Sequence, residues 1–364
     1  MGRFFRTTVA ALAIIFCSGA IGADLTVGTW NIKRLGHGNQ TSFKALAHVA
    51  RHADLIAVQE VMNEGAVDRL VLALENATGD DWSAINSHLI GNSYKEMYSF
   101  VYNERTVSYE DGAVVYLDRG NKFIREPFSA RFRSRQTGDV IAVATVHILY
   151  GKGVGDRLPE IIELDAYWNW LGEVYPGTPR MLMGDFNLDP HHQAWSTLRK
   201  SALPLITEGA STLSSINGRY ANLYDNVYVS KETALPIRRS VIVDFPKLLG
   251  WDHEKSRAHV SDHAPIFVTL GQPAGATNLP VVTDQTTKNG QRKKSKEVAA
   301  SAPNRVETSA SAAYKGAVRG NRNSSIFHRP DCPSYASISP HNIVLFNSGQ
   351  EAIAGGYRLA GNCP

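Results

Sequence analysis

Acidic, amide and histidine side chains follow short apolar segments at five places in this 364-residue chain. These residues are Asn31 in "TWNIK", Glu60 in "AVQEV", His147 in "ATVHILY", Asp185 and Asn187 in "MGDFN", and Asp262 and His263 in "HVSDHAPI". Taken singly, an Asp or Asn after a strand usually forms a turn or caps a helix. Because the pattern recurs without helix-capping residues to explain it, it favours one shared chemical site.

Side chains rich in oxygen ligands suit the hydrolysis of a phosphodiester. Mg²⁺ is typically held by one or two carboxylates together with phosphate and water, and Glu60 and Asp262 can supply those carboxylates. Asn31 and Asn187 carry no charge that would repel a phosphate, so they can orient it or the attacking water. No serine or cysteine nucleophile stands out, so direct attack by water is the simplest reaction. The lack of cysteine ligands also argues against zinc in this part of the chain.

The two histidines, His147 and His263, can exchange protons near neutral pH. A carboxylate partner would fix the tautomer of each ring and stabilise its charged form. Two such groups allow opposed transfers, in which one group takes a proton from water and another protonates the leaving 3′ oxygen. The sequence does not divide these tasks between the histidines and Asp185.

Short strand-like segments alternate with helical patterns from Asp24 to Leu270. The strand-like segments are "LTVGTWNI", "DLIAVQEV", "MYSFVYN", "GAVVYL", "DVIAVATVHI", "PRMLMGDF", "LYDNVYV", "RSVIVDF" and "APIFVTL". In residues 156–175 apolar side chains recur every three or four positions, as in a helix that packs one face on a core. Many strands with few helices predict an α+β fold of two packed sheets with helices on the outer faces.

The N-terminal residues 1–23 have the pattern of a secretory signal peptide. Arg3 and Arg6 precede an apolar run from Val9 to Phe16, and small residues end at Ala20 or Ala23. This run is too short to span a bilayer, and no other segment is long and apolar enough. We therefore expect a soluble protein without a membrane partner, exported to the periplasm or secreted.

The charge and the C-terminal third of the chain predict further divisions. Removal of residues 1–23 leaves 36 basic against 34 acidic residues, so any nucleic acid must be bound in a local groove rather than by a general basic surface. Residues 271–315 are rich in Ala, Ser, Thr, Pro and Asn and predict a disordered linker. Residues 316–364 predict a small separate module, and its two cysteines, Cys332 and Cys363, predict one disulfide in an exported protein.

Seven blocks in order, "TWNIK", "QEV", "NSYKEMY", "TVHILY", "GDFN", "YDNVYV" and "SDHAPI", resemble the endonuclease/exonuclease/phosphatase superfamily, and "NSYKEMY" resembles its deoxyribonuclease I branch. The resemblance covers about residues 25 to 270. It implies a four-layer α/β/β/α sandwich, a monomer, and hydrolysis of DNA with little sequence preference to leave 5′-phosphate ends. The implied cofactor is Mg²⁺, with Mn²⁺ and structural Ca²⁺ as further possibilities.

The same resemblance implies roles for the metal ligands and the phosphate-binding residues. Glu60 is the implied main metal ligand, with Asn31 and Asp262 nearby. Asp185 and Asn187 are implied to position or activate water and to hold the scissile phosphate.

For proton transfer, the resemblance implies that His147 and His263 form a general acid/base pair. Glu96 is implied to orient His147, and Asp225 to orient His263. Tyr94 is implied to lie against the minor groove of the substrate.

The sequence departs from the branch in several places. Met62 stands where the branch often has an arginine that enters the minor groove, which puts affinity and sequence preference in doubt. No cysteine lies between Asp24 and Asp331, so packing or bound Ca²⁺ must replace the disulfide of the extracellular animal members. In "RFRSR", Arg131 and Arg133 are either a substitute for phosphate contact or part of a solvated hairpin.

The last fifty residues resemble the zinc-binding module of the Ada DNA-repair protein, which uses four cysteines. At the corresponding positions this chain has His328, Cys332, Ala360 and Cys363. Because one ligand is missing, closed tetrahedral zinc is poorly supported, and a Cys332–Cys363 disulfide is favoured.

Two other functions fit parts of the pattern. One is a phosphodiesterase or phosphatase that acts on a phospholipid or inositol phosphate, against which the "SYKEMY" block argues. The other is a non-catalytic nucleic-acid-binding protein, which would be expected to lack an acid or a histidine in one of the blocks, and none is lost. The favoured interpretation is a secreted, metal-dependent DNA endonuclease.

Overall fold

The computed structural model describes residues 25–38, 40–92, 94–232, 235–271 and 279–283, together with 316–322, 326–332, 335, 338, 342–360 and 363. The expected signal peptide and most of the expected linker lie outside the described residues. In the part of the chain that the structure describes, no helix is both long and apolar enough to cross a membrane.

One six-stranded sheet contains strands from both ends of the segment 25–270. Its strands, in spatial order, are β11 (Ile237–Ile242), β12 (Ile266–Leu270), β1 (Leu25–Leu35), β2 (Leu55–Val61), β4 (Met97–Asn103) and β3 (Trp82–Asn86). The central pair, β1 and β2, is parallel, and the other pairs are antiparallel. The carboxyl ends of β1 and β2 therefore meet at the same edge.

A second six-stranded sheet has a similar organisation. Its strands, in spatial order, are β5 (Val107–Val115), β6 (Phe128–Ser134), β7 (Val140–His147), β8 (Arg180–Asp185), β10 (Asp225–Ser230) and β9 (Ala202–Pro204). Here the central pair, β7 and β8, is parallel. Each sheet thus brings the ends of two central strands together.

The two sheets pack face to face around the main hydrophobic core. The stacked rings of Phe100 and Phe128 join β4 to β6, with centroids 5.2 Å apart. A buried hydrogen bond of 2.7 Å from Gln59 Nε2 to Thr145 Oγ1 joins β2 to β7. Core packing therefore holds the central strands of both sheets in fixed register.

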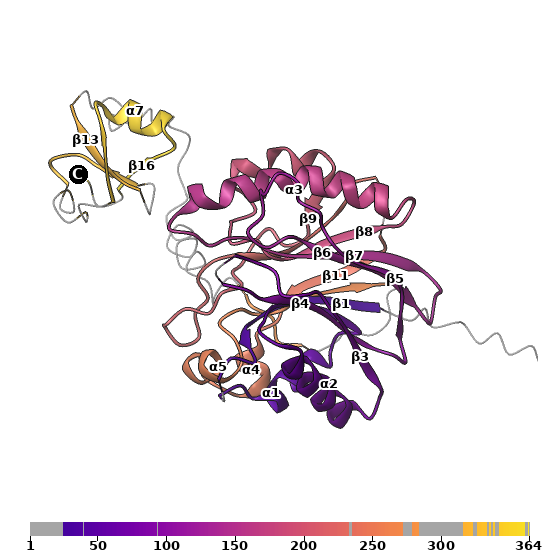
Figure 1. Ribbon diagram of the computed structural model, residues 1–364. Helices are drawn as coiled ribbons and strands as arrows, with labels where there is room; N and C mark the ends of the chain where they lie inside the picture. The colour runs from indigo at the N-terminus through magenta and orange to yellow at the C-terminus, as the bar shows by residue number, and fades with distance from the viewer. Residues whose placement is uncertain are drawn as a thin grey trace, which may run out of the picture.

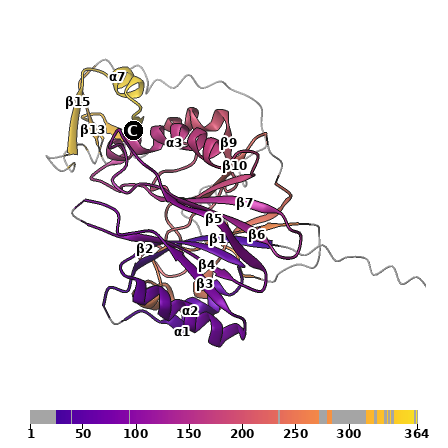
Figure 2. The ribbon, with the colours of Figure 1, turned by 45° about the vertical axis from the view of Figure 1, so that its right-hand side comes forward.

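Helices cover the outer faces of the sandwich (Figures 1 and 2). Helix α3 (Val154–Val174) packs on the second sheet through Leu164, Trp168 and other apolar residues of the pattern predicted in residues 156–175. Helices α1 (Phe43–Ala50), α2 (Glu64–Thr78), α4 (Phe245–Leu249) and α5 (His253–His259) lie on the side of the first sheet. The short 3₁₀ turns η1 (Gln193–Ser196) and η2 (Leu198–Lys200) lie between β8 and β9 in sequence. The predicted four-layer α/β/β/α sandwich is confirmed.

Residues 279–283, which the sequence pattern assigns to the linker, pack against the sandwich. Residues 279–283 run beside the end of β11, where Val282 N donates to Ile242 O at 2.9 Å and Asp244 N donates to Pro280 O at 2.9 Å. Leu279 and Val282 pack against the main core. Apolar side chains within an otherwise polar stretch account for this contact.

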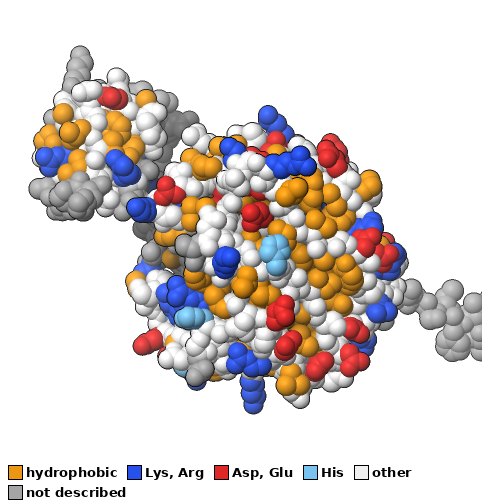
Figure 3. Space-filling model, viewed as in Figure 1, with side chains coloured by type: hydrophobic (Ala, Val, Ile, Leu, Met, Phe, Trp, Pro, Cys, Tyr) orange, Lys and Arg blue, Asp and Glu red, His pale blue; other side chains and the backbone are white. Residues whose placement is uncertain are grey.

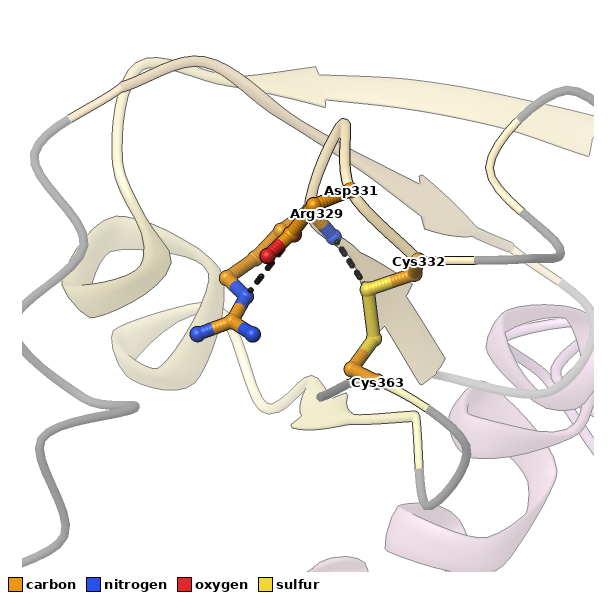
Figure 4. The surroundings of a disulfide bond; sticks show 4 residues. All are labelled: Arg329, Asp331, Cys332 and Cys363. Carbon is orange, nitrogen blue, oxygen red and sulfur yellow. Dashed lines mark hydrogen bonds and ion pairs between the residues drawn. A yellow bond between two sulfur atoms is a disulfide. The ribbon is translucent and has the colours of Figure 1, made fainter.

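The described residues of the C-terminal module form a small sheet and one short helix. Its strands, in spatial order, are β15 (Ile343–Phe346), β13 (Val318–Asn321), β14 (Ile326–His328) and β16 (Arg358–Leu359), and its helix is α7 (Gly349–Ala354). Val318, Phe327 and Ala352 form its core. The predicted disulfide between Cys332 and Cys363 is present (Figure 4). So small a core gains stability from this covalent closure, which is worth roughly 3–4 kcal/mol for a loop of this length.

Candidate active site

Two histidines from different parts of the chain face the carboxylate of Asp185. His147 Nε2 lies 3.6 Å and His263 Nε2 lies 3.7 Å from Asp185 Oδ2. His147 ends β7 and Asp185 ends β8, and the two residues are partners in the parallel ladder. The close approach of the strands requires Gly184, because a Cβ there would overlap the Val146 carbonyl oxygen. The strand ends thus deliver Asp185 to the centre of the site.

Each of these histidines is held from behind by a buried carboxylate. His147 Nδ1 lies 2.7 Å from Glu96 Oε1, and His263 Nδ1 lies 2.8 Å from Asp225 Oδ2. Asp225 begins β10 and is the ladder partner of Asp185. Because Nδ1 is occupied in both rings, Nε2 of each ring is directed towards Asp185. The structure therefore forms both of the predicted histidine–carboxylate pairs.

Charge and burial act against each other in this cluster. Burial alone would lower the pKa of His263, but the carboxylates of Asp225 and Asp185 outweigh it and raise that pKa to about 10. Burial alone would also lower the pKa of His147, but the charge of Glu96 outweighs it, and the pKa is raised. Burial raises the pKa of Asp185. The two rings therefore favour the imidazolium form, and a cation beside Asp185 would counter this by competing for its charge.

Glu60 occupies an unusual backbone conformation next to Asp185. Its φ is +58°, in the left-handed region, where the register of β2 shifts against both neighbouring strands. The carboxylate accepts from Asn31 Nδ2 at 3.0 Å and from Arg34 N at 3.0 Å. A non-glycine residue held this way costs about 1–3 kcal/mol and is common at functional sites. The bulge turns Glu60 out of the strand and into the site.

Asn31 connects the two acids at the centre of the site. Its Nδ2 donates to Glu60 Oε1 at 3.0 Å and to Asp185 Oδ2 at 3.1 Å, while its Oδ1 accepts from Lys33 N at 3.1 Å. Asn31 therefore holds the carboxylates of Glu60 and Asp185 in position relative to each other.

A cavity of about 380 Å³ opens in front of these groups. Its lining residues are Lys33, Arg34, Glu60, Tyr94, Asp262 and His263. Its two carboxylates, Glu60 and Asp262, are oxygen donors of the kind that a hard divalent cation prefers, and no thiolate is present among the lining residues. The donor set fits Mg²⁺ or Mn²⁺, with Glu60 and Asp262 as the residues that would hold it.

Asn187 lies on the other side of Asp185 and lines a second cavity of about 420 Å³. It also has a left-handed backbone, with φ of +51°. Its backbone N donates to Asp185 Oδ1 at 2.9 Å, and its side-chain Nδ2 donates to Ile148 O at 2.8 Å. Asp262 and His263 line both cavities, so the reacting groups lie between two recesses.

Tyr94 lies at the rim of the first cavity, 39% exposed, with its hydroxyl 3.3 Å from Met62 Sδ. The guanidinium of Arg34 lies over its ring, 5.5 Å from the centroid. Tyr94 is therefore brought to the site.

Arg131 and Arg133 are not brought to the site. Both are in β6, where they pair with Asp111 and with Glu110 on the neighbouring strand β5. The guanidinium of Arg131 lies over the ring of Tyr175, at the end of α3. These ion pairs satisfy the two arginines as parts of an exposed sheet surface.

Several supporting residues were not predicted from the sequence. Arg125 is buried, donates to His147 O at 2.9 Å and lies 3.5 Å from Glu96 Oε1. Tyr98 Oη accepts from His147 N at 2.9 Å. Ser211 Oγ donates to Asp225 Oδ2 at 2.6 Å. Arg125 and Ser211 stand in none of the quoted blocks, and Tyr98 ends the block "NSYKEMY" without a role assigned from the sequence. The role of each residue depends on which segments become neighbours.

Solved structures show the same fold. An endonuclease/exonuclease/phosphatase from Bacteroides vulgatus superposes with a TM-score of 0.50 and 14% identity, over 68% of this chain and 98% of that one. The D. rerio protein TDP2, solved with a single strand DNA product, gives a TM-score of 0.50 at 14% identity, over 69% of this chain and all of that one. The fold of this chain is therefore that of the endonuclease/exonuclease/phosphatase structures.

Similarity to curated proteins identifies the family to which this chain belongs. A deoxyribonuclease from Thioalkalivibrio sp. is 47% identical over 272 residues, which cover 72% of this chain and 75% of the relative. Deoxyribonuclease-1 of Homo sapiens is 30% identical over 289 residues, which cover 71% of this chain and 96% of the relative. The chain belongs to the deoxyribonuclease family and is a hydrolase with DNA-hydrolysing nuclease activity.

The C-terminal module matches a different family, the metal binding domain of Ada, over residues 304–364. His328, Cys332 and Cys363 lie close together, with their ligand atoms within 4.8 Å of one another. The two sulfur atoms are bonded to each other, which occupies them in the oxidised protein.

Proposed function

We propose that this chain is an exported, metal-dependent endonuclease that hydrolyses DNA with little sequence preference and leaves 5′-phosphate ends. The observation that carries this proposal is the convergence of two histidine–carboxylate pairs on Asp185, beside the cavity lined by Glu60 and Asp262. Such an arrangement supplies two proton-transfer groups and a cation site around one point. Binding alone would require neither pair.

The two rings are placed for opposed proton transfers. As a water oxygen forms its bond to phosphorus, one group near Asp185 accepts the water proton. The bond from phosphorus to the 3′ oxygen breaks, and the second group donates a proton to that oxygen. The products are a 3′-hydroxyl and a 5′-phosphate. Glu96 and Asp225 keep each Nε2 directed at the reacting atoms throughout.

The cation would be held by Glu60 and Asp262, with Asn31 fixing the position of Glu60. When bound, such a cation neutralises charge that develops on the phosphate oxygens. Asn187 is anchored at its backbone and side chain, so it can help to hold the phosphate without repelling it. From the family resemblance we also propose that structural Ca²⁺ binds elsewhere in the protein.

Export is proposed from the pattern of residues 1–23, in which Arg3 and Arg6 precede an apolar run. The mature enzyme would work as a monomer in the periplasm or outside the cell. Acidic and basic side chains are interspersed on the viewed face of the described residues (Figure 3), which supports a local groove over a general basic surface. N-terminal sequencing of protein exported by its host would test the cleavage after Ala20 or Ala23.

A plasmid-nicking assay tests the reaction. We expect nicked circles to appear before linear DNA, all cleavage to stop with EDTA, and Mg²⁺ or Mn²⁺ to restore it. Ligation of the nicks without added kinase would demonstrate 5′-phosphate and 3′-hydroxyl ends. A parallel assay on sphingomyelin and inositol phosphates is expected to give no product. Cleavage that survives chelation would contradict the metal role of Glu60 and Asp262.

A further inference from the structure

An exposed tyrosine stands at the rim of the second cavity, beside the reacting groups. Tyr150 follows β7 by three residues and is 57% exposed, although a large aromatic side chain gains stability from burial. The cavity that it lines also contains Asn187, Asp262 and His263. Tyr150 has no role in the proposed proton transfers or in holding the cation.

A buried cation supports this ring from one side. The guanidinium of Arg157 lies over Tyr150, 4.3 Å from the ring centroid, and Arg157 itself is 5% exposed. Such a cation–π contact is favourable, more so when the cation is removed from water. Tyr224 lies beside the pair, with its ring centroid 6.4 Å from that of Tyr150. Tyr150 is thus supported from beneath while much of its surface faces solvent.

The same arginine fixes the ring relative to the reacting groups. Arg157 Nε donates to Tyr150 O at 2.9 Å, and Arg157 Nη1 donates to the carbonyl oxygen of Asn187. Asn187 in turn donates to Asp185 Oδ1. A continuous set of hydrogen bonds therefore joins the backbone of Tyr150 to the centre of the site, while the cation–π contact with Arg157 supports the ring itself.

The remaining lining of this cavity is mostly polar, with Leu213 and Ala221 as its apolar members, and can form hydrogen bonds with a base edge. Thr212, Ser214 and Asn222 contribute hydroxyl and amide groups. A volume of about 420 Å³ is within the range of about 300–1,000 Å³ that small-molecule pockets have. An aromatic ring beside a polar recess is the combination that accepts a nucleobase, whose face stacks and whose edge forms hydrogen bonds.

We propose that Tyr150, supported by Arg157, is a stacking platform for an unpaired base next to the scissile phosphate, so that the cleavage of single-stranded DNA depends on this ring. A base within a duplex is stacked on both faces and cannot offer one to Tyr150. A single strand, a loop or a frayed end can. Stacking on an aromatic ring is tolerant of sequence, so the platform does not conflict with low sequence preference. This inference rests on the proposed nuclease function.

The ratio of kcat/KM on a single-stranded oligonucleotide to kcat/KM on its duplex tests the platform. We expect Tyr150→Ala to lower this ratio by about 5- to 150-fold, as the loss of one stacked base predicts, and Tyr150→Phe to keep it near the wild-type value. Tyr109→Ala is the matched control, because Tyr109 is 38% exposed and lines neither cavity. A purely structural role for Tyr150 would lower both rates equally and leave the ratio unchanged, which would overturn the proposal.

Oligonucleotides that lack one base can show which base of the substrate stacks on Tyr150. Single-stranded oligonucleotides with one base removed at successive positions should show one position, adjacent to the cleaved bond, where wild-type cleavage falls. Tyr150→Ala should be insensitive to that same removal. Equal sensitivity in the variant would contradict stacking on Tyr150. Wild-type protein that cuts duplex but no single strand would also overturn the inference, whereas protein that cuts neither would overturn the proposed function itself.

Discussion

Asp225 holds His263 in place through a partly buried hydrogen bond of 2.8 Å between Asp225 Oδ2 and His263 Nδ1. The bond fixes the ring so that Nε2 is directed at Asp185, and the charge of Asp225 contributes to the raised pKa of His263. Replacement of Asp225 by Asn would remove the charge and allow the wrong tautomer. We expect kcat/KM to fall by about 10²- to 10⁴-fold, with the pKa of His263 lowered. NMR titration of the ring and the pH profile of kcat/KM would measure both effects.

Ser211→Ala is a graded control for this variant. It removes the 2.6 Å hydrogen bond to Asp225 Oδ2 but leaves the charge in place, so we expect a much smaller loss. Equal losses in the two variants would mean that the position of Asp225, and not its charge, determines the rate.

Replacement of the histidines tests whether they act as one unit. His147→Ala and His263→Ala should each lower kcat/KM by about 10²- to 10⁴-fold. The double variant should lose much less than the product of the two effects, because groups that act in one step are not additive. Single-turnover cleavage with folding checked by circular dichroism would measure this. Near-normal rates in both single variants would eliminate the proposed proton transfers.

The sequence predicts the ends of the strands well and their surroundings poorly. His147 and Asp185 end apolar segments whose alternation and length are visible in the chain. Asn31 instead lies inside β1, which continues to Leu35, and the structure brings these three residues together. The bulge that turns Glu60 into the site depends on pairing with two other strands, and no local signal reveals it. Arg125 and Ser211 could not be predicted for a related reason, since neither adjoins a catalytic residue in sequence. Arg131 and Arg133 looked available for phosphate because their acidic partners lie on the preceding strand.

The charge of the His263 pair should make the stability of the metal-free protein depend on pH. A folded-state pKa of about 10, raised from 6.5, contributes stability that is fully present below pH 6.5 and is lost as the pH rises through 10. Urea unfolding of EDTA-treated protein between pH 6.5 and 10 should therefore show a declining free energy of unfolding. His263→Gln should flatten this decline. An unchanged slope in His263→Gln would show that other groups cause the decline.

Arg34 is expected to contribute to DNA affinity in the first cavity. Its guanidinium lies over Tyr94 beside Glu60, where it can approach a phosphate. We expect Arg34→Ala to raise KM with little change in kcat, and to reduce the slope of log affinity against log salt by about 1. Fluorescence anisotropy with a short duplex in EDTA would measure the slope.

Met62→Arg offers a test by restoration. Met62 Sδ is 3.3 Å from the Tyr94 hydroxyl. An arginine at position 62, which is longer than methionine and positively charged, can therefore reach the same ring. In the Arg34→Ala background, Met62→Arg should recover much of the lost affinity and the lost salt dependence. Arg51→Ala, an exposed arginine outside both cavities, should change neither quantity. A salt slope in Arg34→Ala equal to that of the wild type would exclude a phosphate contact.

Two truncations should separate the end of the catalytic domain from the C-terminal module. A chain that ends after Thr283 keeps Leu279 and Val282 packed against the core and the hydrogen bonds beside β11, so we expect wild-type kcat/KM on plasmid and an unchanged Tm for the catalytic domain. A chain that ends after Leu270 loses these contacts and exposes apolar surface, at a cost of about 25 cal/mol per Å². We therefore expect a lower Tm with the same kcat/KM at low temperature, because, among the residues that the structure describes, none that lines either cavity lies beyond His263. Differential scanning calorimetry and plasmid nicking on both chains would measure this. If the chain that ends after Thr283 folds but is inactive, the C-terminal module must supply part of the reaction.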